Sequence, residues 1–314
     1  RAGLLSTQNI RGDTNRAVLK RIKESGDIFW AESDRPWILD GANVHVSMVA
    51  FDDGTEKSRR LDGQAVGTIN ANLTSQSDLT QALSLQENKE ACFLGIMKAG
   101  AFDIDEQAAL QMLDSPNSHG RPNSDVLRPR FNARDLLHNT GGGWIIDFGV
   151  DMEMTAAQRY EKPWGHIDLH VRPEREKNRR ARMAERFWLH GEARPGLRRA
   201  LGGLSRFIVT PEVSKHRVFV WMDSVVLGDH RTRVITRCDD YTFGVLHSRF
   251  HEVWSLTVGP SLEDRPCYTT PCFETFPFPE ADAGQRAAIG AAAAELNTLR
   301  EGWLNPPEWT RTET

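Results

Sequence analysis

The sequence lacks a long apolar run, a disulfide framework and a glycine-rich phosphate-binding turn. The longest small, apolar stretch, residues 287–294, is far shorter than the roughly 18–20 residues of a membrane helix, so we expect no membrane-spanning segment. Four cysteines scattered over 314 residues exclude a cysteine-stapled secreted fold and make a reducing cytoplasm the expected location. The triple glycine at 141–143 precedes a strand-like run instead of following one, so no dinucleotide or triphosphate site is predicted.

Charge is distributed unevenly along the chain. The formal net charge is −4, yet residues 121–233 carry 21 Lys and Arg against 14 Asp and Glu, and the remainder is strongly acidic. The densest part is 172–199, where ten basic side chains face four acidic ones. Charge alone leaves two interpretations open: a surface that contacts nucleic-acid phosphates, or a solvent-exposed helix face with many ion pairs.

Local patterns predict an α/β beginning, a mixed middle and a helical end. The predicted strands include 3–7, 27–31, 42–51 and 242–247, with a break at 33–36 between the second and the third. The predicted helices include 13–25 ended by Gly26, 104–113 opened by Asp103 or Asp105, 175–190, and an alanine-rich helix from Ala281 or Asp282 to about Trp303.

Two sequence patterns resemble a metal site and a catalytic motif, but we expect their residues to have structural roles. His247 and His251 lie one helical turn apart, but the metalloprotease pattern H-E-x-x-H is absent and the cysteine spacings match no zinc ribbon, so no metal site is predicted. The Asn-Pro-Pro sequence at 305–307 is followed by Glu308, where an adenine-methylating motif has an aromatic residue, and we interpret it as the end of a helix.

Eight segments, in order over most of the chain, share one resemblance. They are residues 3–54, LDG at 61–63, INANLT at 69–74, GRPNSDVLRP at 120–129, WIIDFG at 144–149, TPEVSKHRVFVW at 210–221, FGVLHSRFHEVWSL at 243–256 and YTTPCFETFPFP at 268–279. Together they resemble the C-terminal half of large bacterial adenine-specific DNA methyltransferases of the MmeI-like, type IIL or IIG, restriction-modification class.

The resemblance implies a fold and a division of labour. Residues 1–55 would be the last strands of a class I α/β methyltransferase core, 56–275 an α+β DNA target-recognition domain, and 276–314 a Pro-rich turn and helix. The partners would be double-stranded DNA and a missing N-terminal methyltransferase region, with a nuclease in some parents, and no membrane. S-adenosylmethionine would be bound mainly by that missing region. Its glycine-rich turn and catalytic Asn-Pro-Pro motif are not in this chain, which is therefore expected to be inactive alone and, since it opens with Arg1, to be part of something longer.

Site residues follow from the chemistry of that class. An adenine flipped out of duplex DNA needs an aromatic face, for which Trp37 is the first candidate and Trp30 the second; packing of both rings in the core is the alternative. The predicted phosphate contacts are Arg175, Arg179, Arg180, Arg182, Lys215 and Arg217. The predicted base readers are Arg121, Asn123, Ser124, Arg128 and Arg130, because guanidinium and amide groups suit guanine and adenine.

Two other functions remain open. The chain could be a stand-alone DNA-binding specificity module that recruits a separate catalytic subunit, or a phage-defence protein that uses the same recognition domain without restriction. An upstream reading frame with the cofactor and catalytic motifs would decide against the first.

Overall fold

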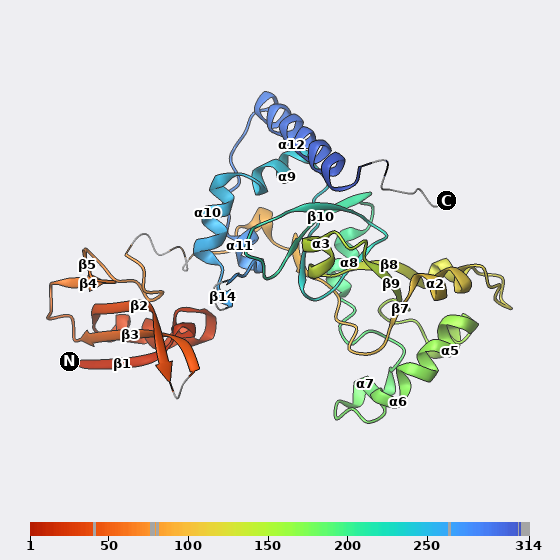
Figure 1. Ribbon diagram of the computed structural model, residues 1–314, viewed down its shortest axis with the longest axis horizontal. Helices are drawn as coiled ribbons and strands as arrows, with labels where there is room; N and C mark the ends of the chain where they lie inside the picture. Colours follow the sequence, from red (N-terminus) through yellow and green to blue (C-terminus); the bar gives the residue numbers. More distant parts are fainter. Residues whose placement is uncertain (40–41, 76–78, 80–81, 263–264, 307, 309–314) are drawn as a thin grey trace. The chain divides into compact units, whose positions relative to one another are not determined.

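The computed structural model describes residues 1–39, 42–75, 79, 82–262, 265–306 and 308 (Figure 1). The chain divides into two compact units. The first unit comprises Arg1–Leu83 with Leu256–Cys267, and the second comprises Ser84–Ser255 with Tyr268–Thr314. The fold is therefore mixed α/β with several separate sheets. No helix in the described ranges is long and apolar enough to cross a membrane.

A five-stranded sheet in the order β1-β3-β2-β4-β5 organises the first unit (Figure 1, red to orange). Strand β3 lies between β1 and β2 and is antiparallel to both, while β4 joins β2 in parallel and returns as β5 through the turn Asp62–Gly63. Both turn residues have positive φ, as a two-residue Asp-Gly hairpin requires. The elements are β1 (Ala2–Thr7), η1 (Gln8–Arg11), η2 (Asp13–Arg16), α1 (Ala17–Ser25), β2 (Asp27–Leu39), β3 (Ala42–Asp52), β4 (Arg59–Leu61), β5 (Gln64–Val66), β14 (Ser261–Leu262) and β15 (Arg265–Pro266).

Helix α1 and its terminal glycine confirm the local sequence pattern. Leu19 and Ile22 are buried against the sheet, which accounts for the helical spacing of this segment. Gly26 ends the helix and donates its N–H to Ile22 O. A Cβ at position 26 would lie 1.9 Å from Asp52 O, so the close approach of β3 excludes any larger residue.

The predicted break at 33–36 is wrong, because β2 continues through it to Leu39. The strand adapts with a register shift between Glu32 and Arg35. Pro36 is tolerated because β4 pairs only with Trp30 and Ala31, so at Pro36 the side of β2 away from β3 is an open edge that needs no N–H donor.

Two four-stranded sheets form the framework of the second unit. Their orders are β11-β10-β13-β6 and β12-β8-β9-β7. Apolar side chains from the second sheet, such as Leu127, Ile145 and Ile146, pack into a core with Phe148 and Trp188. The strands are β6 (Cys92–Leu94), β7 (Asp103–Ile104), β8 (Leu127–Phe131), β9 (Gly143–Ile146), β10 (Arg206–Pro211), β11 (Val220–Asp223), β12 (Leu227–Gly228) and β13 (Thr232–Ile235).

Helices of the second unit begin where their caps predict. Asp105 accepts a hydrogen bond from Ala108 N at the start of α2, and Asp282 forms a capping box with Gln285 at the start of α12. The helices are α2 (Glu106–Leu113), α3 (Ala133–His138), α4 (Met154–Ala157), α5 (Glu161–His170), α6 (Arg172–Arg175), α7 (Ala181–Glu185), α8 (Pro195–Leu201), α9 (Asp240–Leu246), α10 (Arg249–Val258, ending in the first unit), α11 (Thr270–Glu274) and α12 (Ala283–Leu304), with the 3-10 turns η4 (Gln86–Asn88) and η5 (Asn123–Asp125).

Two predictions in this unit are wrong. The expected strand at 242–247 is helix α9, because Asp239 accepts a hydrogen bond from Thr242 N and caps it. The expected long helix at 175–190 is instead two single turns, α6 and α7, separated by residues 176–180. Pro173 lies in the first turn of α6, and the Asn178 side chain accepts a hydrogen bond from Arg180 N, which offers the backbone an alternative to helix.

A buried ion pair joins β9 to α8. Asp147, directly after β9, accepts hydrogen bonds from both terminal nitrogens of Arg198, each at 2.8 Å, and a third from Gly149 N. The Asp147 side chain is 3% exposed, and His190 Nδ1 lies 3.6 Å from its Oδ1. Burial by itself raises the pKa of Asp147, but the charges of His190 and Arg198 and the hydrogen bonds reverse this, so the pKa lies below its ordinary value.

Candidate nucleic-acid interface

An exposed cationic stretch covers residues 176–186, from the end of α6 to the residue after α7, and we call it the cation segment. Figure 1 labels the two helices. The side chains of Arg179, Arg180 and Arg182 are exposed there, as are those of Lys177 and Arg186. None of these five cations forms an ion pair with any residue that the structure describes. Three of the predicted phosphate contacts therefore lie together and are accessible to an anionic partner.

Arg175, at the start of the same stretch, is buried, which corrects its prediction as a phosphate contact. It is 2% exposed, and its guanidinium donates to Ala99 O at 2.8 Å and to Lys98 O at 2.7 Å. The group also lies 5.4 Å from the centre of the Phe102 ring, and burial lowers its pKa. Arg175 therefore anchors α6 to the body of the second unit.

Apart from exposed Arg199, the rest of the basic block is engaged within the protein. Arg172 bonds to Asp168 and Glu176, Arg194 pairs with Glu192, and Arg198 holds Asp147. The two interpretations of the charge pattern both apply, to different parts: internal ion pairs at 172 and 194–198, and an exposed cationic surface at 176–186.

The loop at 120–125 presents only some of its predicted base readers. Ser124 is exposed, and the Arg121 side chain is 66% exposed while it pairs with Asp125. Asn123 is fully buried, and its amide nitrogen donates to Met112 O and Ser115 O. Asn123 therefore holds the loop, which corrects its prediction as a base reader.

The two arginines of β8 differ in their availability. Arg128 is half-buried, and no side-chain partner is recorded for it among the described residues. Arg130 is 20% exposed and lies 2.9 Å from Asp103 Oδ1 and 3.7 Å from Asp135 Oδ2, and Asp103 also contacts Lys98. A base contact by Arg130 would require it to leave these carboxylates.

Lys215 and Arg217 likewise divide into an exposed and an engaged residue. Lys215 is exposed. Arg217 donates to Pro211 O at 2.6 Å and to Thr210 Oγ1 at 3.2 Å, and its guanidinium lies 5.0 Å from the centre of the Tyr268 ring. Arg217 is half-buried, and a phosphate contact by it would compete with these internal contacts.

The two predicted base-stacking tryptophans both lie on β2. Trp37 pairs with Val44 near the far end of the hairpin and is 39% exposed, with Ile38 beside it 77% exposed. Trp30 is half-buried where β2 is flanked by Ala50 of β3 and Arg60 of β4. Trp37 is thus the more accessible of the two rings.

The histidine pair is part of an aromatic core. His251 is fully buried, and its Nε2 lies 2.8 Å from Tyr268 Oη, while His247 Nδ1 lies 2.9 Å from Phe243 O. Burial lowers the pKa of His251 to about 3. Among the described residues, no three His, Cys, Asp or Glu side chains gather in an arrangement that could hold a metal ion.

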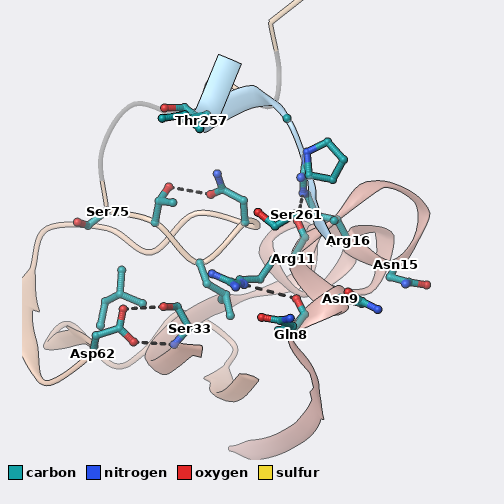
Figure 2. Close-up of a pocket in the computed structure, with 18 residues that line it drawn as sticks. Gln8, Asn9, Arg11, Asn15, Arg16, Ser33, Asp62, Ser75, Thr257 and Ser261 are labelled. Atoms are coloured by element: carbon teal, nitrogen blue, oxygen red, sulfur yellow. Dashed lines mark hydrogen bonds between the residues drawn. The ribbon is translucent and has the colours of Figure 1, made fainter. Parts of the chain in front are cut away.

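A large cavity lies in the first unit, and sequence reasoning missed it (Figure 2). Its volume is about 730 Å³, and its lining is mostly polar. It collects side chains from η1, η2, β2, the β4–β5 turn, residues 72–75 and residues 256–261. The segments STQNIRGDTN and INANLT, which supply much of this lining, contain many amides and hydroxyls, and that composition was the available signal.

Comparison with solved structures defines the class of fold. The chain is similar to a structure of the type IIL restriction-modification enzyme MmeI in complex with DNA, with a TM-score of 0.74 and 19% sequence identity. The match covers 98% of this chain and 44% of that one, so the chain spans less than half the length of that enzyme. A search of curated proteins finds no match.

A family model supplies the particular assignment. The model for the MmeI target recognition domain matches residues 112–280, which is more than half of the chain. The chain therefore belongs to the MmeI target recognition domain family, and the matched range includes the cation segment.

Proposed function

We propose that this chain recognises a DNA target for a site-specific, S-adenosylmethionine-dependent DNA adenine methyltransferase of the restriction-modification type. One observation carries the proposal: the family match at 112–280 includes a segment whose arginines are exposed and form no ion pair with the part of the chain that the structure describes. Exposed guanidinium groups neutralise backbone phosphates and release condensed counterions, which provides affinity independent of sequence.

The refined set of DNA contacts follows from exposure. Arg179, Arg180, Arg182 and Lys215 position the DNA backbone, and Arg121, Ser124 and Arg128 are the remaining base readers. Trp37 supplies the aromatic face for a flipped adenine, since its ring is partly accessible.

Residues 1–55 are proposed as the end of a class I methyltransferase core, 56–275 as the recognition domain and 276–314 as an appended turn and helix. The fold similarity supports this division because it extends over 98% of the chain, including the first unit. The remaining partner is an N-terminal methyltransferase region that binds the cofactor, in a bacterial cytoplasmic parent. Because the chain contains neither a glycine-rich cofactor turn nor the Asn-Pro-Pro-aromatic motif, we propose that it does not methylate DNA unaided.

Salt-dependent DNA binding tests the proposal. Arg179→Gln/Arg180→Gln is compared with a matched pair of adjacent exposed cations on α1, Lys20→Gln/Arg21→Gln, by fluorescence anisotropy with a labelled duplex. Each lost phosphate contact should reduce the slope of log affinity against log salt by about 0.9, so the first variant should lose about 1.8 and the control none. Equal slopes for the wild type and the Arg179/Arg180 variant would contradict the proposal.

A further inference from the structure

The polar cavity of the first unit is built like a ligand site. At about 730 Å³ it lies within the range of small-molecule sites and has room for a nucleotide. Two of its three charged lining residues are arginines, Arg11 and Arg16, and the third is Asp62. Figure 2 shows Arg11 between Gln8 and the Asp62–Ser33 pair, and Arg16 nearer to Ser261.

The two arginines are held in place by the backbone that carries them. Arg16 Nε donates to Arg11 O at 2.6 Å, and Arg11 Nε donates to Gln8 O at 3.4 Å. Arg11 also donates to Asp34, at 2.8 Å, and Asp34 is shared with His45 Nδ1 at 2.6 Å. Side chains fixed in this way lose little entropy when they bind an anion.

The only carboxylate that lines the cavity among the described residues is already saturated by hydrogen bonds. Asp62 accepts one hydrogen bond from Ser33 N at 2.6 Å and another from Ser33 Oγ at 2.7 Å, one on each oxygen (Figure 2). Its charge is therefore spread over local donors, and the wall opposite the arginines does not strongly repel an anion.

A buried amide completes the set of donors. Asn72 is 8% exposed and lines the cavity, and its Oδ1 accepts a hydrogen bond from Thr74 Oγ1 at 2.7 Å. Its amide nitrogen donates to no group that the structure describes, so it is available to a ligand oxygen. The turn that carries it is tight, with Asn70 N bonded to Thr74 O, and Leu73 between them adopts φ +56.

We propose that this cavity binds one phosphate-bearing nucleotide unit of a DNA strand. Arg11 and Arg16 contact the phosphate, and Asn72 with the neighbouring hydroxyls contacts the sugar and phosphate oxygens, which is the donor set that protein–DNA backbone contacts use. The inference rests on the proposed function, since it makes the first unit a second place where the chain holds the nucleic acid that the cation segment attracts.

The test titrates the ¹⁵N-labelled chain with the single-stranded tetranucleotide dA₄ and follows the Asn72 side-chain amide and the Arg16 Nε–H by NMR. Both signals should shift. Arg16→Gln should weaken binding by about tenfold, as loss of a charge-assisted hydrogen bond does, whereas Arg21→Gln on α1, outside this cavity, should leave it unchanged. Asn72→Asp, which keeps the acceptor for Thr74 and replaces the donor with a negative charge, should also weaken binding.

Two further probes separate the sources of phosphate. If inorganic phosphate or deoxyadenosine 5′-monophosphate shifts the same signals with equal affinity, the cavity is a site for a free phosphate compound and the DNA assignment is overturned. No shift of either signal with millimolar dA₄ also overturns it. A failure of the proposed function gives a different result. In that case the duplex binds the wild type and the Arg179/Arg180 variant with the same salt slope, and this outcome is independent of whether dA₄ shifts the Asn72 signal.

Discussion

Arg198→Met is expected to destabilise the second unit by about 3–5 kcal/mol, because it leaves the Asp147 carboxylate buried without its cation. The Asp147 side chain is 3% exposed, and the two Arg198 hydrogen bonds at 2.8 Å are the charged contacts that compensate its burial. The remaining hydrogen-bond donor, Gly149 N at 3.1 Å, is neutral, and His190, 3.6 Å from the carboxylate, has its own pKa lowered by burial, so it replaces little of the lost positive charge. For a unit of this size, each kcal/mol lowers the melting temperature by about 2–4 °C, so we expect a fall of roughly 6–20 °C.

The assay is thermal unfolding by differential scanning calorimetry with a matched control. Arg199→Met changes the neighbouring exposed arginine of the same helix and should alter stability by less than about 0.5 kcal/mol. Asp147→Asn/Arg198→Met removes both charges and should recover most of the loss, because no buried charge is then left unpaired. An Arg198→Met protein that melts within 2 °C of the wild type, or a double variant no better than the single one, would refute this reasoning.

Three further predictions concern other parts of the molecule. The pKa of His251 is about 3 in the folded chain and near 6.5 in the unfolded chain, so the unfolded chain takes up a proton first as the pH falls. The free energy of unfolding should therefore decrease below pH 6.5 by up to about 1.4 kcal/mol per pH unit. Denaturant titrations at pH 7.5, 6 and 5 should show a smaller decrease for His251→Gln than for the wild type. Gly26→Ala should destabilise the first unit, since its methyl group would collide with Asp52 O, and unchanged melting would contradict that close approach. Arg217→Met removes internal hydrogen bonds and should lower the free energy of unfolding by about 1–3 kcal/mol. Lys215→Met changes an exposed side chain, so it should weaken DNA binding and leave the melting temperature unchanged.

Features set by short-range chemistry could be predicted from the sequence. Asp105 and Asp282 cap helices within three residues of themselves, and Gly26 ends α1, so these boundaries were confirmed. The prediction of a break at 33–36 was wrong because it rested on Pro36. A proline is tolerated in β2 at this position since the paired part of β4 reaches only Trp30 and Ala31, and a local sequence pattern does not show where a neighbouring strand ends.

The composition of the candidate interface was predictable, but the availability of each side chain was not. The density of arginine between 172 and 199 correctly located the exposed cations. It could not distinguish Arg179 from Arg175, whose acceptors Lys98 and Ala99 are 77 and 76 residues away, or from Arg198, whose partner Asp147 is 51 residues away. Burial and pairing depend on such distant contacts, which a single sequence does not contain.

Among the described residues, the cation segment is held by Arg175 directly before it, by buried Met183 within it and by buried Phe187 directly after it. Between these anchors its exposed side chains carry almost none of the stability of the unit, because substitutions at such positions change the free energy of unfolding by about 0.5 kcal/mol or less. The charge and length of the segment can therefore change between related chains while packing elsewhere maintains the fold. Related chains that share the anchors should diverge most steeply here, and swapping this stretch between them should leave folding intact.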